Sequence, residues 1–138
     1  MTSPTLKLTS SQVVAVEPQG KNLAASLKKG ERLWPNPPQF LDTIAEGIMT
    51  QQVGQLTFPI LCDLCDDVIT VTDADMAEAC RLAAERMKLV VEAASGAAIA
   101  ATWDEKVKAM EGDKVGVILC GGNVDTDKLP WCDKRIKK

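Results

Sequence analysis

Short apolar runs alternate along the chain with segments that carry helix signals. The apolar, β-branched runs are typical of strands buried in a sheet, and they cover residues 12–18, 66–72 and 115–119. The helix-like segments cover residues 22–29, 57–65, 73–88 and 95–110. This alternation predicts an α/β fold, in which helices flank an open, mostly parallel sheet.

Capping residues mark the expected helix ends. Asn22 is expected to cap the first helix and Gly30 to stop it. The longest helix is expected to begin at Thr72 or the next residue, and the last helix at residues 95–96. The apolar face of the longest helix is predicted at Met76, Ala79, Ala83 and Met87. Residues 34–39 contain three prolines, which exclude regular structure there.

Five cysteines and no histidine restrict the available chemistry. An odd number of cysteines without secretory features favours reduced thiols, and the absence of histidine excludes Cys-His and Ser-His nucleophile pairs. Cys62 and Cys65 form a C-x-x-C motif, but a zinc site would have to recruit an isolated thiol such as Cys80. The run FPILCDLCDD favours the alternative, a buried helix. Its core face is expected to hold Ile60, Leu61, Leu64 and Cys65.

Length and charge set the broad class of protein. The chain has 138 residues, of which 46% are hydrophobic and 25% charged, as expected for one globular domain. A net charge of -3 without a basic patch argues against nucleic acid as a partner. No apolar run reaches the ~18 residues of a membrane span and no signal-peptide core is present. We therefore expect no membrane partner and a cytoplasmic location.

The third apolar run ends abruptly in CGGN, residues 120–123. Ligands of open α/β sheets bind beyond the carboxyl ends of the strands, and two glycines let the backbone approach a ligand without Cβ atoms. Gly-Gly is also a common turn dipeptide. The residues alone leave open whether this is a ligand crevice or a plain turn.

Six stretches make the chain similar to the fold-type II pyridoxal-phosphate enzymes, in particular to their serine racemase and serine/threonine dehydratase branch. They are VVAVEP, TIAEG, LTFPI, DDVITVT, ERMKLVVE and VILCGGNVD, and they occur in the family's order at close to its spacing. The resemblance implies that residues 12–125 are part of a catalytic domain of the tryptophan synthase β-like type, namely the C-terminal half of its large domain. Residues 1–11 would be a polar lead-in and residues 126–138 a C-terminal tail. The implied cofactor is pyridoxal phosphate, and the implied substrates are L-serine and L-threonine.

By the same resemblance, the loop that begins at Cys120 lies beside the cofactor ring. Cys120 matches the residue that hydrogen-bonds the ring nitrogen, a position that is usually serine in racemases and that tolerates cysteine in dehydratases. The other residues that would shape this wall are Gly121, Gly122 and Asn123. A thiol with an unperturbed pKa near ~8.5 is mostly neutral, so it makes the ring a weaker electron sink than a carboxylate partner would. This favours elimination of water and ammonia, with racemisation close behind.

Three more positions carry over from the family. Gly47 matches a glycine that lines the ring, and Glu92 matches a glutamate near the ring, although the proline that usually follows is Ala93 here. Glu17 matches a carboxylate that helps to hold a divalent cation in the racemase branch, but the second metal acid, expected near residues 22–23, is missing. The alternative for Glu17 is a solvated carboxylate at a strand end.

Two parts of the family's machinery have no counterpart in the sequence. The lysine that binds the cofactor covalently lies in a Ser-Phe-Lys-like motif, and the cofactor phosphate lies in a glycine-rich loop; both are absent. One hypothesis is a segment of a serine/threonine dehydratase or serine racemase that is inactive alone. The alternative is a non-catalytic truncated paralogue or isoform that contacts a full-length subunit, since the family commonly forms homodimers. A third is an incomplete gene product, so whether the chain is an enzyme stays open.

Overall fold

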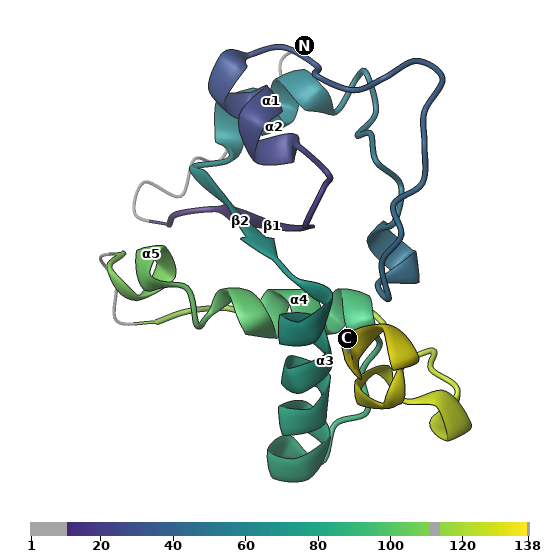
Figure 1. Cartoon of the computed structure of the whole chain (residues 1–138). Helices are drawn as coiled ribbons and strands as arrows, with labels where there is room; N and C mark the ends of the chain where they lie inside the picture. Colours follow the sequence, from purple (N-terminus) through teal and green to yellow (C-terminus); the bar gives the residue numbers. More distant parts are fainter. Residues whose placement is uncertain (1–10, 111–113, 138) are drawn as a thin grey trace, which may run out of the picture.

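The computed structural model describes residues 11–110 and 114–137. The strands and helices are β1 (Val14–Pro18), α1 (Leu23–Lys29), α2 (Phe58–Leu64), β2 (Asp67–Val71), α3 (Asp73–Leu82), α4 (Ala93–Ala101) and α5 (Glu105–Lys108). The short turns are η1 (Glu46–Ile48), the π-turn η2 (Ala83–Met87), η3 (Thr126–Lys128), η4 (Pro130–Cys132) and η5 (Lys134–Lys137). Figure 1 shows α1 and α2 on one side of the two strands and α3 and α4 on the other. The predicted α/β fold is confirmed.

β1 and β2 form a parallel pair, as the sequence predicts. Val16 lies opposite Ile69 in the register, and the backbone N–H of Gln19 continues the ladder to the carbonyl of Val71 at 3.0 Å. Each strand is a short β-branched run that ends before polar residues, so local sequence and pairing agree. β2 is buried at Val68, Ile69 and Val71 and forms the floor on which α4 packs.

The third predicted strand is wrong within the described part of the chain. Residues 115–119 are not part of the sheet, whose only strands are β1 and β2 among the described residues. The side chains of this segment are exposed, from 36% at Leu119 to 81% at Ile118. A strand requires a neighbour to satisfy its backbone donors and acceptors, and no described strand lies beside this segment. The apolar pattern is that of a buried strand, but the neighbour that would bury it is missing from the described residues.

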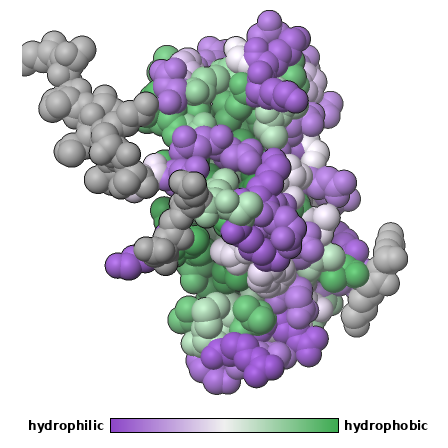
Figure 2. Space-filling model, turned by 90° about the vertical axis from the view of Figure 1, so that its left-hand side faces the viewer, coloured by the Kyte–Doolittle hydropathy of each residue, from purple (hydrophilic) through white to green (hydrophobic). Residues whose placement is uncertain are grey.

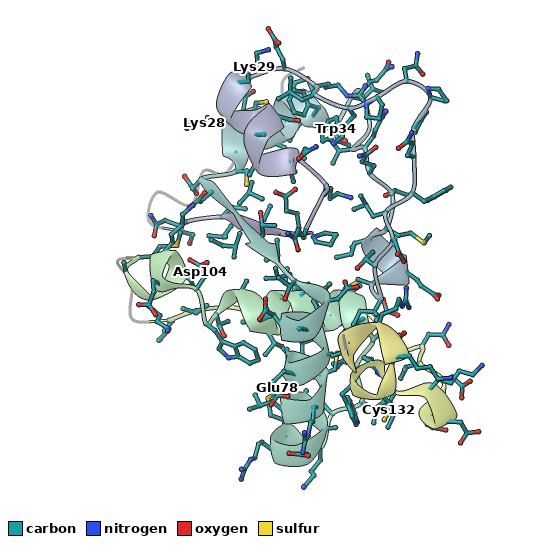
Figure 3. The ribbon with its side chains drawn as sticks, viewed as in Figure 1. Lys28, Lys29, Trp34, Glu78, Asp104 and Cys132 are labelled. Carbon is teal, nitrogen blue, oxygen red and sulfur yellow. The ribbon has the colours of Figure 1, made fainter. Side chains whose placement is uncertain are left out.

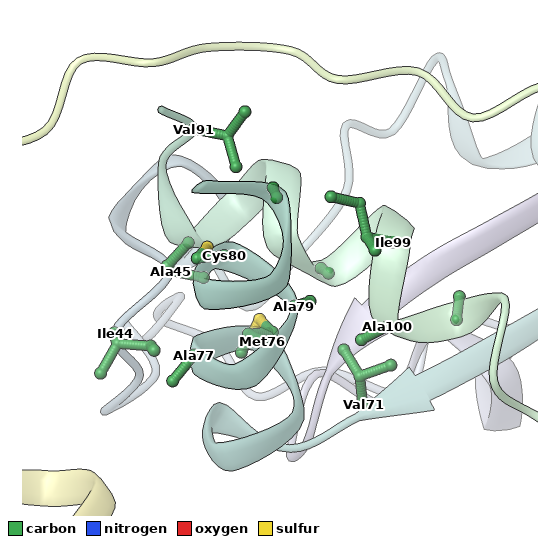
Figure 4. Packing of buried hydrophobic residues seen from close by; sticks show 14 of the residues in the cluster. Ile44, Ala45, Val71, Met76, Ala77, Ala79, Cys80, Val91, Ile99 and Ala100 are labelled. Carbon is green, nitrogen blue, oxygen red and sulfur yellow. The ribbon is translucent and has the colours of Figure 1, made fainter. Parts of the chain in front are cut away.

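The core lies where α3 crosses α4 beneath the sheet (Figure 4). Small side chains and glycine let the two helices approach closely. A Cβ placed on Gly96 would lie 2.5 Å from Cys80 Sγ and 2.6 Å from the Met76 carbonyl oxygen. The largest fully buried side chain is Met76, which fills the space between α3 and its neighbours.

The start of α3 follows the prediction, but its end does not. Thr72 and Asp75 form a reciprocal capping box, in which the Thr72 hydroxyl accepts from the Asp75 N–H at 3.2 Å. Three residues of the predicted face are buried, whereas Met87 is 44% exposed. The π-turn η2 advances the chain past the helical register, so the last predicted position faces outward.

The helix predicted from residue 95 to residue 110 is wrong in both its start and its continuity. α4 begins at Ala93 with Glu92 as N-cap, and Ser95 and Gly96 lie inside it. α5 begins only after Asp104, whose carboxylate accepts from the Lys106 N–H at 2.8 Å. This side-chain cap starts a new helix instead of extending α4.

The helix α2 forms where predicted, but its predicted core face is only partly right, since Leu61 and Cys65 are half-buried and the other two residues are exposed. Ile60 is 55% exposed and Leu64 42% exposed, while Phe58 is buried with its ring edge-on to Trp34 at 5.8 Å between centroids. Nothing in the described chain covers the outer face of this seven-residue helix, so its apolar residues remain in contact with solvent.

The thiols around α2 form no metal site in the described part of the chain. Cys62 is exposed, Cys65 is half-buried, and Cys80 lies in the α3–α4 core. Among the described residues no group of three or more metal-ligating side chains is found, so the zinc interpretation of the C-x-x-C motif has no support. In residues 11–110 and 114–137, no helix combines the length and apolarity that crossing a membrane requires.

Candidate functional site

Three of the predicted site residues meet at the beginning of α4. The Glu92 N–H donates to the Gly121 carbonyl at 3.3 Å, and the Ser95 hydroxyl donates to the same oxygen at 2.9 Å. A Cβ on Gly47 would lie 3.0 Å from Glu92 Oε1, and a Cβ on Gly121 would lie 2.6 Å from Glu92 Cδ. The Glu92 carboxyl group therefore lies between two stretches of backbone without side chains. We call Gly47, Glu92 and Gly121 the glycine-glutamate wall.

The glycines of this wall are required by its geometry. Gly121 has φ +109°, a conformation that residues with a side chain rarely adopt. A Cβ on Gly122 would lie 2.9 Å from the Val90 carbonyl oxygen, so the loop also needs a second glycine to run beside the strand-like segment before α4. The Gly-Gly pair forms a turn that brings its backbone against Glu92, and its approach to a ligand stays a prediction.

Ser95 is a site residue that the sequence analysis missed. Its side chain is 1% exposed and anchors the Gly121 carbonyl, whereas the sequence suggested only a helix cap. A small hydroxyl residue inside an alanine-rich helix is the signal that could have revealed this role, since such residues often bond to nearby backbone groups.

The Glu92 carboxylate keeps its acceptor oxygens available. As N-cap of α4 it makes no side-chain capping bond within the described chain, although a helix N-terminus favours a negative charge. The residue is half-buried, so a donor on a bound molecule can reach it. The missing Cβ atoms of Gly47 and Gly121 leave the space that the Glu92 carboxyl group occupies, so a ligand at this wall would meet that carboxyl group.

Cys120 and Asn123 flank the glycine pair at the surface. Both are exposed, and the Cys120 thiol is free. Cys120 adjoins Gly121 in the chain and so stands at the edge of the glycine-glutamate wall, where a neutral S–H could donate to an acceptor on a ligand. The structure brings the backbone of this loop to Glu92, and leaves these two side chains facing solvent.

Three lysine side chains make their contacts with groups outside this wall. The Lys88 ammonium donates to the Glu85 carbonyl at 2.7 Å, Lys106 pairs with Asp67, and Lys108 pairs with its neighbour in α5. Figure 3 shows Lys28 and Lys29 on α1, on the other side of the sheet from α4. Within the described residues, none of these provides a covalent anchor for a cofactor beside Glu92.

Glu17 is neither solvated nor arranged for a divalent cation. It is 2% exposed, and its Oε2 accepts from the Leu23 N–H at 2.6 Å. Its Oε1 accepts from the Ala24 N–H at 3.3 Å and from the Thr70 hydroxyl at 3.0 Å. Glu17 thus caps α1 in place of Asn22, whose backbone is left-handed and whose side chain makes no capping bond. A carboxylate offers about four lone-pair positions, so these three bonds leave little for a metal ion, and the residues present do not fit one.

An apolar groove of about 820 Å³ separates the free edge of β1 from residues 114–118. Its walls include Val14 and Val16 of β1 and Val117 of the extended segment. Its lining also includes four alanines of α4, namely Ala94, Ala97, Ala98 and Ala101. Figure 2 shows hydrophobic side chains gathered on the face of the molecule that looks to the left in Figure 1. The edge of the sheet and an apolar surface are therefore open together.

Comparison with known proteins places the chain in a family. The sequence profile of the pyridoxal-phosphate dependent enzymes matches residues 4–121. A serine racemase from Dictyostelium discoideum is 40% identical over 120 residues, which cover 86% of the chain and 36% of that relative. An L-threo-3-hydroxyaspartate ammonia-lyase from Saccharomyces cerevisiae is 38% identical over 115 residues, which cover 83% of the chain and 34% of that relative.

A solved structure agrees with the sequence matches. The crystal structure of a pyridoxal 5'-phosphate-dependent aspartate racemase has a TM-score of 0.86 to the chain at 52% identity, over 91% of the chain and 39% of that structure. The chain spans little more than a third of the length of these relatives. Because the profile covers most of the sequence and the fold is shared, the chain belongs to the fold-type II pyridoxal-phosphate-dependent enzymes.

Proposed function

We propose that the chain supplies the ring-side wall of the cofactor site in an enzyme that eliminates water and ammonia from L-serine or L-threonine, or racemises L-serine. The observation that carries the proposal is the placement of Glu92 between the Cβ-free backbones of Gly47 and Gly121, with Cys120 beside them. The relative named as a serine racemase supports L-serine, a solved threonine deaminase that is 32% identical supports L-threonine, and the L-threo-3-hydroxyaspartate ammonia-lyase supports the release of ammonia. Pyridoxal phosphate, when bound, would withdraw electrons from the bonds at the amino acid's Cα atom.

The residues of the wall would bind and orient the ring. The two glycines would leave room for the Glu92 carboxylate beside the ring, and Asn123 with Gly122 would shape the rim of the same loop. The Cys120 thiol would donate a neutral hydrogen bond to the ring nitrogen and so leave that nitrogen without a full positive charge. The Glu92 carboxylate would fix the ring's tilt through a donor on the cofactor or substrate.

The role of Cys120 can be tested in a full-length relative that carries residues 12–125 of this chain. Cys120→Ser should keep most of the turnover, because a hydroxyl makes the same neutral bond. Cys120→Ala should weaken cofactor binding by about 0.5–1.5 kcal/mol, the contribution of one hydrogen bond. Cys120→Asp should protonate the ring and divert turnover to transamination. The proposed role is wrong if serine abolishes activity while aspartate leaves turnover and absorption spectrum unchanged.

We further propose that the chain alone is inactive, because its sequence contains neither the family's cofactor lysine nor its phosphate loop. The test is incubation with pyridoxal phosphate, borohydride reduction and mass spectrometry of the peptides. Scattered labelling of exposed lysines is expected. A single stoichiometric adduct on one lysine would show that the chain has its own anchor.

A second candidate function is non-catalytic contact with another chain of this family, in the cytoplasm. The open groove beside β1 favours it, and we commit to one occupant: a β-strand from the part of the family's catalytic domain that this chain does not span. Such a strand would pair with the free edge of β1 and cover the exposed valines of residues 115–119. Without it, the chain should self-associate in size-exclusion chromatography with light scattering. A sharply monomeric species with a cooperative melt would contradict this.

A further inference from the structure

Lys21 carries an ammonium group that is turned into the protein. The residue is 8% exposed, which is unusual for a lysine, and it lies in the connection between β1 and α1. Its Nζ donates to the Ile48 carbonyl at 3.3 Å and also to the Thr50 carbonyl. Burying a charge costs free energy unless the charge is paired and hydrogen-bonded. The two hydrogen bonds to carbonyl oxygens therefore offset part of the cost of burying this ammonium.

The surroundings of this ammonium are those of a small cation. Two backbone carbonyl oxygens, those of Ile48 and Thr50, accept from it. Glu17 forms no salt bridge with it, because the Glu17 carboxylate accepts from α1 and from Thr70. Carbonyl and carboxylate oxygens are also the ligands that divalent cations prefer. The lysine backbone is fixed as well, because the Trp34 indole N–H donates to the Lys21 carbonyl at 2.5 Å.

We propose that the Lys21 ammonium holds the Gly47 loop in place through the Ile48 and Thr50 carbonyls, and that Glu17, whose carboxylate caps α1, holds no divalent ion to do so. The lysine joins the connection after β1 to Ile48, the last residue of the η1 turn that contains Gly47, and to Thr50 two residues further on. A divalent cation at Glu17 is disfavoured because its carboxylate oxygens already accept from Leu23, Ala24 and Thr70, and the Ile48 and Thr50 carbonyls already accept from Lys21. The site therefore confers independence from divalent ions, which the match of Glu17 to the racemases would not suggest.

The first test compares Lys21→Met, which keeps the length of the side chain without its charge, with Lys28→Met on the exposed face of α1. Lys21→Met should lower the melting temperature by roughly 5–10 °C and speed amide hydrogen exchange at residues 46–50. Lys28→Met should change neither. If the two variants match in melting temperature and in exchange at residues 46–50, the ammonium does not hold the loop and the proposal fails.

The second test uses the native chain, so its outcome does not depend on whether Lys21→Met folds. Manganese is titrated while the relaxation of water protons is followed, with Glu17→Gln as the matched variant. The proposal expects the same weak, non-saturating response in both proteins, and a melting temperature that chelator and magnesium leave unchanged. A saturable site in the native chain that disappears in Glu17→Gln would overturn it. Neither outcome depends on pyridoxal phosphate.

Discussion

Replacing Gly96 with alanine adds one methyl group at the closest contact between α3 and α4. The new Cβ would lie 2.5 Å from Cys80 Sγ and 2.6 Å from the Met76 carbonyl oxygen. The sulfur belongs to a fully buried side chain, and the carbonyl belongs to helical backbone, so neither can rotate away. The two helices must separate to admit the methyl group.

The expected loss of stability is the difference between two opposing effects, the better helix propensity of alanine and the overpacking of the core. Alanine is favoured over glycine inside a helix by about 1 kcal/mol. Overpacking a core costs about 1–3 kcal/mol and occasionally more, and a clash with backbone belongs at the upper end. We therefore expect Gly96→Ala to lower the free energy of unfolding by about 1–2 kcal/mol, which corresponds to a fall in melting temperature of roughly 3–8 °C.

The assay is urea and thermal denaturation followed by circular dichroism, with Gly116→Ala as the control. No atom lies within 4 Å of a Cβ built on Gly116, so the control should change the stability by less than about 1 kcal/mol. Gly96→Ala with the stability of the native chain, or more, would refute the close α3–α4 contact. The control separates this clash from general effects of replacing glycine.

The remaining predictions concern α3 and the glycine-glutamate wall. Thr72→Ala removes the capping box and should cost about 1 kcal/mol in urea denaturation; an unchanged midpoint would contradict the cap. Burial raises the pKa of the Cys80 thiol from 9.0 to about 11, so the unfolded chain loses this proton first and stability should fall as the pH rises from about 9 to about 11. Cys80→Ala should flatten this dependence, and an equally steep fall in that variant would assign it to other groups. In native protein, iodoacetamide should label Cys120 well before Cys80 by mass spectrometry, and equal rates would contradict the burial of Cys80. Gly121→Ala would place a Cβ 2.6 Å from Glu92 Cδ at φ +109° and should lower the melting temperature more than Gly116→Ala does.

The parts of the fold that the sequence predicted are those set by local chemistry. β1, β2 and the Thr72 cap each follow from a short run of residues, and the structure confirms all three. The predictions that residues 115–119 and Ile60 are buried were wrong for a different reason. An apolar pattern states that a side chain is suited to burial, but only a neighbouring element buries it, and the described chain provides none there.

The candidate site depended on contacts between distant parts of the chain. Gly121 was singled out by the strand-end Gly-Gly pattern, but Gly47 and Glu92 were assigned to the site through the resemblance, because no local pattern indicates that the start of α4 brings the three together. Lys21 was missed because a lysine in a turn between glycine and asparagine resembles a solvated one. The Lys21 side chain points into the protein because its ammonium donates to the Ile48 carbonyl, which is 27 residues away in the sequence.

The central claim is that residues 12–125 form the ring-side wall of a pyridoxal-phosphate site. It is tested most directly by exchanging this segment into the serine racemase from Dictyostelium discoideum, which is 40% identical, and measuring the cofactor that remains bound after gel filtration. The exchanged protein should retain pyridoxal phosphate in stoichiometric amount, as judged by its visible absorbance, and should lose it when Gly121→Ala is added. An exchanged protein that melts cooperatively but retains no cofactor, or retains it equally with Gly121→Ala, would contradict the account.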